Sequence, residues 1–154
     1  MNKKNSNNTK RVQISSWNDS KKFWMSKTEY TGVVVGKDAT DSEYVISDGV
    51  IAPGGFIPDH YHKWEDQTFH IIEGHLEAKI GDTVQRISTG DSIHCPRGVS
   101  HYIKNIGDQP AKLISYIFPG DWAEEFMAET SRQTHAGEHD FELIEKRFGV
   151  VYLR

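Results

Sequence analysis

The chain of 154 residues has only one cysteine, Cys95. A single thiol has no partner within the chain, so an intramolecular disulfide is excluded. Because small disulfide-stabilised domains are typical of secreted proteins, this scarcity favours a reducing compartment. We therefore predict a fold held by its hydrophobic core, with Cys95 as a buried small apolar side chain.

Long apolar runs are also missing. No stretch approaches the roughly 20 consecutive apolar residues that span a bilayer. Residues 1–11 are rich in Asn, Lys, Ser and Thr and are not followed by the apolar segment of a secretory signal. We expect a flexible N-terminal arm at residues 1–11, no membrane partner and a cytoplasmic location.

Positive charge is not in excess. Lys and Arg total 18 and Asp and Glu total 22, so the formal net charge is −4. A mildly acidic chain without clusters of basic residues binds the phosphate backbone of nucleic acids poorly. We therefore expect a small-molecule partner and no nucleic acid, and the length suits one domain.

Most of the chain has the pattern of an all-β fold. Short β-branched and aromatic runs are separated by Gly, Pro and Asp, without a helical pattern between them, which favours a sandwich or barrel over residues 12–118. Gly81-Asp82 predicts a tight hairpin turn, and Asp48-Gly49 is an alternative turn that would split its strand. Examples of the predicted strand runs are 31–36, 44–52, 68–73, 76–80, 84–87, 92–95, 100–104 and 111–118.

Residues 119–154 have a different pattern, which predicts a helical extension packed on the outside of the barrel. Asp121 can cap a first helix, with Glu124 three residues later completing a capping box. A second amphipathic segment has Phe141, Ile144 and Phe148 on one face and ends at Gly149, a residue type typical of helix ends.

Two segments carry the residues of a candidate metal site. The first has the spacing Gly54, five residues, His60, one residue, His62, four residues, Gln67, six residues, Gly74. The second has the spacing Gly90, five residues, Pro96, one residue, Gly98, two residues, His101, three residues, Asn105.

The spacing of the first segment favours convergence on one ion. His60 and His62 are two apart on a predicted strand, so they point to the same face with Cβ atoms on the order of 7 Å apart. If Gln67 begins the next strand, its side chain faces the same interior, and His101 arrives on a third strand from the other half of the barrel. Three imidazoles and one amide oxygen leave coordination positions open, as in a reactive metal site.

Both segments resemble the two motifs of the cupin superfamily, and the second matches all five of its defining positions. Over residues 24–150 the chain resembles the single-domain, quercetin-dioxygenase-like cupins. The resemblance implies a cupin (double-stranded β-helix, or jelly-roll) barrel and a homodimer. It also implies one divalent transition metal, which could be manganese, iron, nickel, cobalt or zinc, held by His60, His62, Gln67 and His101.

Gln67 departs from the family pattern, in which most members have glutamate. An uncharged ligand set leaves the full +2 charge on the ion, which favours a Lewis acid over a redox centre. The same His/His/Gln/His set resembles the uronate-converting cupin of pectin degradation, and a nearby variant occurs in cupin hydroxynitrile lyases. Glu65 or Asp66 remains an alternative carboxylate ligand in place of Gln67.

We therefore expect a metalloenzyme that activates a carbonyl, enol or hydroxyl oxygen of a small organic substrate for isomerisation, elimination or cyclisation. A hydroxide held by the ion, or one of Tyr44, Glu65 or Asp66, would accept the proton. An oxygen-dependent dioxygenase and a non-enzymatic ligand-binding cupin are the alternatives. The residues expected to line the pocket are Trp64, Phe69, Ile71, His94 and Ile103.

Overall fold

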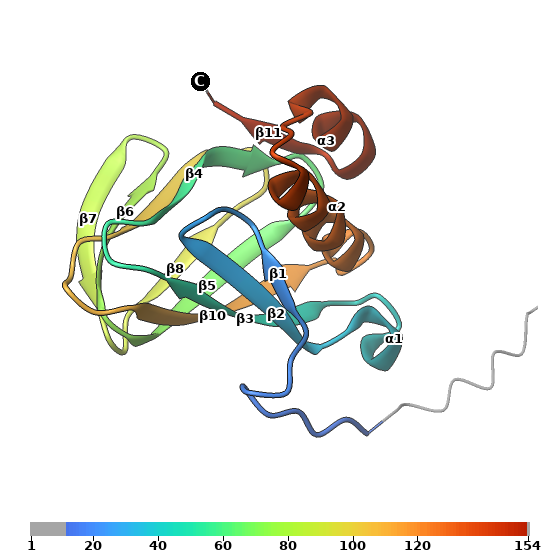
Figure 1. Ribbon diagram of the computed structural model, residues 1–154, viewed down its shortest axis with the longest axis horizontal. Coiled ribbons are helices and arrows are strands. Elements are labelled where there is room, and N and C mark those ends of the chain that lie inside the picture. Colours follow the sequence, from blue (N-terminus) through green and yellow to red (C-terminus); the bar gives the residue numbers. More distant parts are fainter. Residues whose placement is uncertain (1–11, 154) are drawn as a thin grey trace, which may run out of the picture.

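The computed structural model describes residues 12–153, and the arm expected at residues 1–11 lies outside the described residues. Two antiparallel sheets face each other and enclose the core (Figure 1). No helix in the described part of the chain is long and apolar enough to cross a membrane. The prediction of an all-β fold is confirmed.

Each sheet combines strands that are distant in the sequence. The six-stranded sheet has the order β1 (Lys22–Trp24), β2 (Glu29–Val35), β3 (Val45–Ile51), β10 (Ala111–Phe118), β5 (Asp66–Glu73) and β8 (Ser92–Cys95). The five-stranded sheet has the order β11 (Val150–Tyr152), β4 (Phe56–His62), β9 (His101–Asn105), β6 (His75–Ile80) and β7 (Thr83–Ser88). Every predicted strand run is found, β4 is the strand expected to carry His60 and His62, and the short strands β1 and β11 were not predicted.

Alternation along the strands forms the core between the sheets. On β5 the side chains of Phe69 and Ile71 are buried, whereas Ile72 is exposed on the other face. This matches the predicted alternation, because successive residues of a strand point to opposite faces. Cys95 is buried in the same core, and burial raises the pKa of its thiol to about 12.

The two predicted turns have different outcomes. Gly81 has a φ of +55°, and Ile80 pairs with Thr83 across it, so the predicted hairpin is confirmed. The alternative turn at Asp48-Gly49 is wrong, because β3 continues through both residues. The fully buried carboxylate of Asp48 instead accepts a hydrogen bond from Ser20 Oγ at 2.8 Å.

The C-terminal extension has the two predicted helices, α2 (Ala123–Ala136) and α3 (Phe141–Phe148). The predicted capping box is wrong, since Trp122 occupies the N-cap position without a side-chain cap. Glu124 Oε1 instead accepts a hydrogen bond from the backbone N–H of Lys37, at the start of the short helix α1 (Lys37–Thr40). The predicted end of α3 at Gly149 is confirmed.

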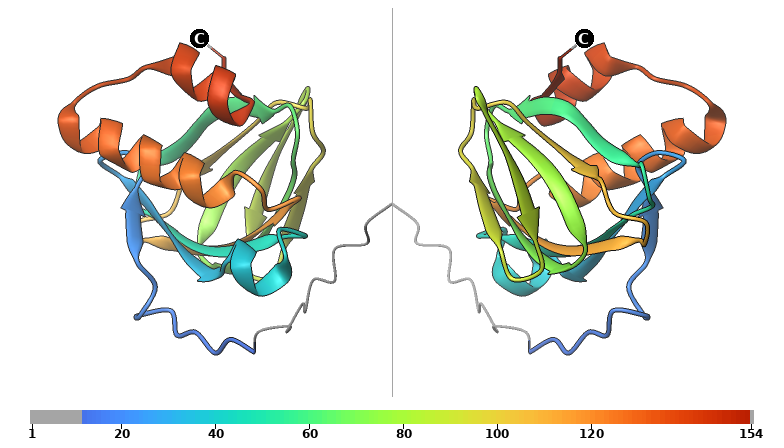
Figure 2. Two further views of the ribbon diagram at one scale, coloured as in Figure 1. Left: turned by 90° about the vertical axis from the view of Figure 1, so that its right-hand side faces the viewer. Right: turned by 90° about the vertical axis from the view of Figure 1, so that its left-hand side faces the viewer.

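The extension also completes the barrel. After α3 the chain forms β11, which pairs with β4 so that Val150 lies opposite His62 and Tyr152 opposite His60. The two helices lie together beside the barrel, with α2 next to β1 and α3 next to β11 (Figures 1 and 2). The extension therefore contains a strand of the sheet in addition to its helices.

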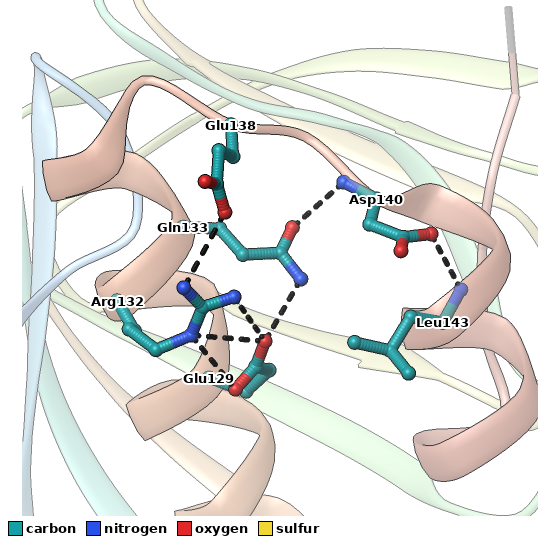
Figure 3. Close-up of polar contacts among 6 residues, drawn as sticks. All are labelled: Glu129, Arg132, Gln133, Glu138, Asp140 and Leu143. Atoms are coloured by element: carbon teal, nitrogen blue, oxygen red, sulfur yellow. Dashed lines mark hydrogen bonds and ion pairs between the residues drawn. The ribbon is translucent and has the colours of Figure 1, made fainter.

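A polar cluster fixes the joint between the helices (Figure 3). The buried amide of Gln133 donates to Glu129 Oε1 at 3.0 Å and accepts from the backbone N–H of Asp140 at 2.8 Å. Arg132 contacts Glu129 at 2.9 Å and Glu138 at 3.3 Å. These contacts hold the connection that leads into α3 and then into β11.

Two glycines in the left-handed region provide a test of this packing. Gly149 has a φ of +67°, and a Cβ atom there would lie 2.7 Å from Trp64 Cδ2. Gly137 has a φ of +68° and nothing within 4 Å of such an atom. We expect Gly137→Ala to lower the free energy of unfolding by on the order of 1 kcal/mol from backbone strain. Gly149→Ala should lower it by about 3 kcal/mol, because overpacking adds to the same strain.

Urea unfolding of both variants measures the two losses. Since Gly137 and Gly149 have nearly the same φ, the backbone strain is the same in both variants. The difference between their losses in free energy of unfolding therefore reports the clash with Trp64 alone. Equal losses would show that the Trp64 ring moves aside without cost and that Gly149 is not required for the packing of β11.

Candidate metal centre

Three histidines converge inside the barrel. His60 and His62 lie on β4, and His101 lies on β9, directly opposite His60. Their exposed fractions are 6, 6 and 1%, respectively. One nitrogen from each ring lies within 4.8 Å of the other two, so these residues could hold a metal ion.

The origin of His101 differs from the prediction. It does not come from the other half of the barrel, because β9 pairs with β4 within the five-stranded sheet. The candidate ligand from the facing sheet is Gln67, on β5. The two motifs therefore provide neighbouring strands for the histidines, and the amide approaches from across the barrel.

Backbone carbonyls orient two of the rings. Pro58 O lies 2.6 Å from His60 Nδ1, and Val99 O lies 3.3 Å from His101 Nδ1. A carbonyl oxygen can only accept, so Nδ1 carries the hydrogen in both rings. In the neutral ring, Nε2 then presents its lone pair to the interior.

Glu65 orients the third ring. Its buried carboxylate lies 3.1 Å from His62 Nδ1, the nitrogen that faces away from the other two rings. A carboxylate behind a ligating histidine fixes the ring and raises its basicity. The structure therefore places Glu65 behind His62 and not among the converging nitrogens.

The other two candidate proton acceptors lie elsewhere. Asp66 Oδ1 and Oδ2 accept hydrogen bonds from Arg97 Nε and Nη2 at 3.1 and 3.0 Å. Hydrogen bonding to Arg97 holds the pKa of Asp66 at about 2. Tyr44 packs against Phe118, with ring centroids 6.0 Å apart, and does not line the cavity beside the histidines. The structure brings neither residue to the three rings.

The converging nitrogens fit a cation. His60 Nε2 and His62 Nε2 are 3.2 Å apart, and the buried His101 Nε2 has no hydrogen-bond partner among residues 12–153. Burial lowers the pKa of His60 well below its usual value and that of His101 to about 4. Neutral rings with their hydrogens on Nδ1 place lone pairs against one another, an arrangement that a divalent ion satisfies.

The amide of Gln67 is oriented by a single contact. Its Nε2 donates to Ser115 Oγ at 2.8 Å, on the neighbouring strand β10. Its buried Oε1 has no hydrogen-bond partner in the described part of the chain. Because Ser115 holds the nitrogen, the oxygen is the atom left available as a fourth ligand, and ligation by Gln67 stays a prediction.

An apolar cavity of about 310 Å³ opens beside the histidines. Both sheets line it, and residues of α2 and α3 form part of its wall. Polar residues that line it, besides those of the candidate metal site, are Ser26, Glu29, Tyr30, Thr31, Ser47, Ser115, Thr130, Gln133, His139 and Tyr152. Apolar residues that line it include Phe69, Leu113, Ile117, Phe126, Met127 and Phe141.

Of the five residues predicted to line this pocket, Phe69 does so. Ile71 and Ile103 lie in the hydrophobic core instead. Trp64 is 40% exposed and sits beside Gly149. His94 is exposed on the outer face of β8, where its Nδ1 hydrogen-bonds Thr68 Oγ1 at 2.8 Å. The outward position follows from alternation, since Ile93 and Cys95 on either side are buried.

Tyr152 and Glu29 are among the cavity residues that were not predicted. Tyr152 lines it from β11, and its ring centroid lies 5.7 Å from that of His60. Glu29 lines it from the first position of β2. Extending the predicted strand 31–36 back by two residues would have found Glu29, because it shares the alternation of Thr31. A three-residue strand such as β11 carries no comparable signal.

Comparison with known proteins agrees with this architecture. Residues 48–117 match the family model for the Cupin domain. Over 69 residues the chain is 32% identical to the tetracenomycin polyketide synthase protein TcmJ of Streptomyces glaucescens, covering 45% of this chain and 46% of the relative. Over 88 residues it is 24% identical to quercetin 2,3-dioxygenase of Bacillus subtilis, covering 57% of this chain and 26% of the relative.

The matched segment spans 46% of the length of TcmJ and 26% of the length of quercetin 2,3-dioxygenase. Among solved structures, KdgF from a Halomonas species has a TM-score of 0.64 at 15% identity, covering 71% of this chain and 94% of that one. The polyketide cyclase RemF from Streptomyces resistomycificus has a TM-score of 0.61 at 18% identity, covering 70 and 80%. These likenesses show the cupin fold.

Metal affinity provides the test of the site. We expect His101→Ala to abolish the binding of one zinc ion per chain, measured by isothermal titration calorimetry. Glu65→Gln should weaken it by about 10–100-fold, because His62 loses its carboxylate partner. The matched control is His94→Ala, which removes an exposed histidine and should leave zinc affinity unchanged. If His94→Ala weakened binding as much as His101→Ala, the assignment would be wrong.

Proposed function

We propose that this chain, whose sheets form a cupin fold, is a metal-dependent enzyme that isomerises, eliminates from or cyclises a small, largely apolar substrate through a carbonyl, enol or hydroxyl oxygen. The observation that carries the proposal is the set of three buried imidazoles whose Nε2 atoms converge beside an apolar cavity. Folds of this kind host many chemistries, so the function rests on the site and not on the fold.

In such a site, some residues would bind the ion and others orient the binding side chains. His60, His62 and His101, with Gln67 Oε1 as the fourth ligand, would hold one divalent ion. When bound, the ion would act as a Lewis acid that polarises the substrate oxygen and stabilises negative charge on it. Pro58, Val99 and Glu65 keep the rings in one orientation, so the ligand set does not reorganise during the reaction.

The lining of the cavity supports an aromatic or polyketide-like substrate over a sugar acid. A sugar acid carries many hydroxyl groups, and burying them without hydrogen-bond partners costs several kcal/mol. The side chains of Phe69, Leu113 and Phe126 provide no such partners, but they pack well against flat apolar rings. The similarity to TcmJ and to the polyketide cyclase RemF supports cyclisation among the three reaction types.

Gln67 supports non-redox chemistry. Three neutral imidazoles and an amide add no negative charge, so the ion would keep its full charge toward the substrate oxygen. Gln67 also cannot accept a proton, and the reaction therefore needs another base. These properties suit enolate formation better than the stabilisation of higher oxidation states.

An oxygen-dependent dioxygenase is the second candidate. The sequence similarity to quercetin 2,3-dioxygenase over 88 residues favours it, and so does a triad of histidines that suits iron, manganese or nickel. The two candidates differ in one requirement, because only the dioxygenase consumes molecular oxygen.

Turnover with and without oxygen separates the candidates. We expect the zinc- or nickel-loaded protein to convert an aromatic polyketide mimic bearing 1,3-diketone groups at equal rates under argon and in air. Gln67→Glu should slow this reaction about tenfold, roughly 1.4 kcal/mol of barrier, because the added charge weakens the Lewis acid. Chromatography of the products and an oxygen electrode with quercetin provide the measurements. Oxygen uptake together with no anaerobic turnover would favour the dioxygenase.

A further inference from the structure

A carboxyl group in the cavity has no assigned partner. Glu29 is half-buried, and its side chain lines the cavity. Among residues 12–153, its carboxyl group makes no hydrogen bond or salt bridge. A carboxyl group that lines an apolar cavity without a hydrogen-bond partner is a candidate functional group.

The position of Glu29 is set by the β1–β2 hairpin. Trp24 pairs with Tyr30, and the backbone oxygen of Glu29 accepts the N–H of Met25 at 3.0 Å, which closes the turn. Glu29 pairs with Ile51 on β3, within the six-stranded sheet. The side chain therefore starts from a backbone that is hydrogen-bonded on both sides, and its position in the cavity is well defined.

Glu29 and the histidines come from opposite sheets. Glu29 lies on the six-stranded sheet, whereas His60, His62 and His101 lie on the five-stranded sheet. Tyr152 connects the two sides: its ring contacts that of His60, and the nearby charge of Glu29 adds to burial in raising its pKa. A substrate in the cavity therefore has the histidines on one side and the carboxyl group on the other.

The surroundings of Glu29 suit proton transfer. Burial raises the pKa of its carboxyl group to about 8, because an apolar environment penalises the charged form. General acid–base catalysis is most effective when the pKa of the group lies near the working pH. Gln67 cannot provide such a group because it cannot accept a proton, and Asp66 cannot because it is paired with Arg97.

We propose that Glu29 is the catalytic acid–base residue of this cavity and exchanges a proton with a substrate held between it and the three histidines; this rests on the proposed function. Glu29 acts on an acidic C–H group next to a carbonyl group. The substrate is thus a ketone or polyketone with its oxygen toward the histidines and its C–H toward Glu29.

The proton transfer is balanced within the substrate and the side chain. The C–H bond breaks, its proton passes to a carboxylate oxygen of Glu29, and its electron pair forms an enolate. In ring closure the enolate carbon bonds to a second carbonyl carbon, and the oxygen of that carbonyl takes the proton back from Glu29. No oxidant or reductant is needed.

Exchange of a substrate proton with solvent tests the assignment. The full-length zinc-loaded protein is incubated in deuterium oxide with 2-hydroxy-1-phenylethanone, a chelating ketone that has an exchangeable C–H group. Loss of the CH₂ signal is followed by proton NMR. We expect Glu29→Gln to slow the exchange by about 10²–10⁴-fold, the usual contribution of a general base. Affinity for zinc and for the ketone should stay within about twofold of wild type.

The matched control is Glu43→Gln, which neutralises an exposed glutamate in the loop before β3 and should exchange at the wild-type rate. Exchange by Glu29→Gln at the wild-type rate, or no exchange by the zinc- and ketone-bound wild type, would overturn the role of Glu29 alone. Failure of the wild type to bind zinc would instead overturn the proposed function.

The pH dependence gives a second readout. Since Glu29 must be ionised to accept a proton, the wild-type rate should rise with pH and level off above the pKa of about 8. Glu29→Gln should lose this rise, and a rate without inflection near that pH would contradict the proposal. The other ionisable side chains that line the cavity are Tyr30, His60, His62, Glu65, His139 and Tyr152.

Stability provides a readout that needs neither metal nor substrate. The folded protein holds the proton of Glu29 up to a pKa of about 8, whereas the unfolded chain loses it near 4.5. The folded state therefore binds more protons in this window, and the contribution of Glu29 to stability falls as the pH rises through it. The free energy of unfolding of wild type minus that of Glu29→Gln should decrease over this range. A constant difference would contradict burial of the carboxyl group in the cavity.

Discussion

The candidate site depends on the hydrogen bonds behind its histidines. Pro58 O and Val99 O accept from the rings of His60 and His101, and a buried carboxylate does the same for the third ring. Because these acceptors hold the hydrogens on Nδ1, all three Nε2 atoms present lone pairs to one point. A cation at that point would satisfy the lone pairs, so the three rings could hold a metal ion.

The C-terminal extension is part of this arrangement. Gly149 allows the chain to leave α3 in a left-handed conformation, and β11 then pairs with the strand that carries His60 and His62. The same extension provides α2 and α3 as part of the cavity wall, and the contacts around Gln133 fix their joint. The helices therefore help to enclose the cavity as well as to cover the barrel.

Charge is distributed unevenly across the cavity. On the histidine side, the three rings and the Gln67 amide that would contact a cation are uncharged, and the carboxylate of Glu65 lies behind His62. The facing sheet provides the carboxyl group of Glu29, whose pKa is raised to about 8 by burial. In the proposed reaction, a cation held by the histidines would polarise the substrate oxygen, and Glu29 would exchange the proton from the facing sheet, an arrangement that suits enolate chemistry.

Alternation within a strand was sufficient to predict the strand runs, the shared face of His60 and His62, and the inward direction of Gln67, because these depend on local backbone geometry. The sequence could not show that His101 lies beside His60, since that follows from pairing between strands distant in the chain. Nor could it show that Glu29 shares a cavity with His60 and Tyr152, since that follows from hairpin closure and from the pairing of β11 with β4. Side-chain direction is thus a local property of the sequence, whereas the neighbours of each side chain are decided by register and sheet closure, which depend on the free energy of the whole fold.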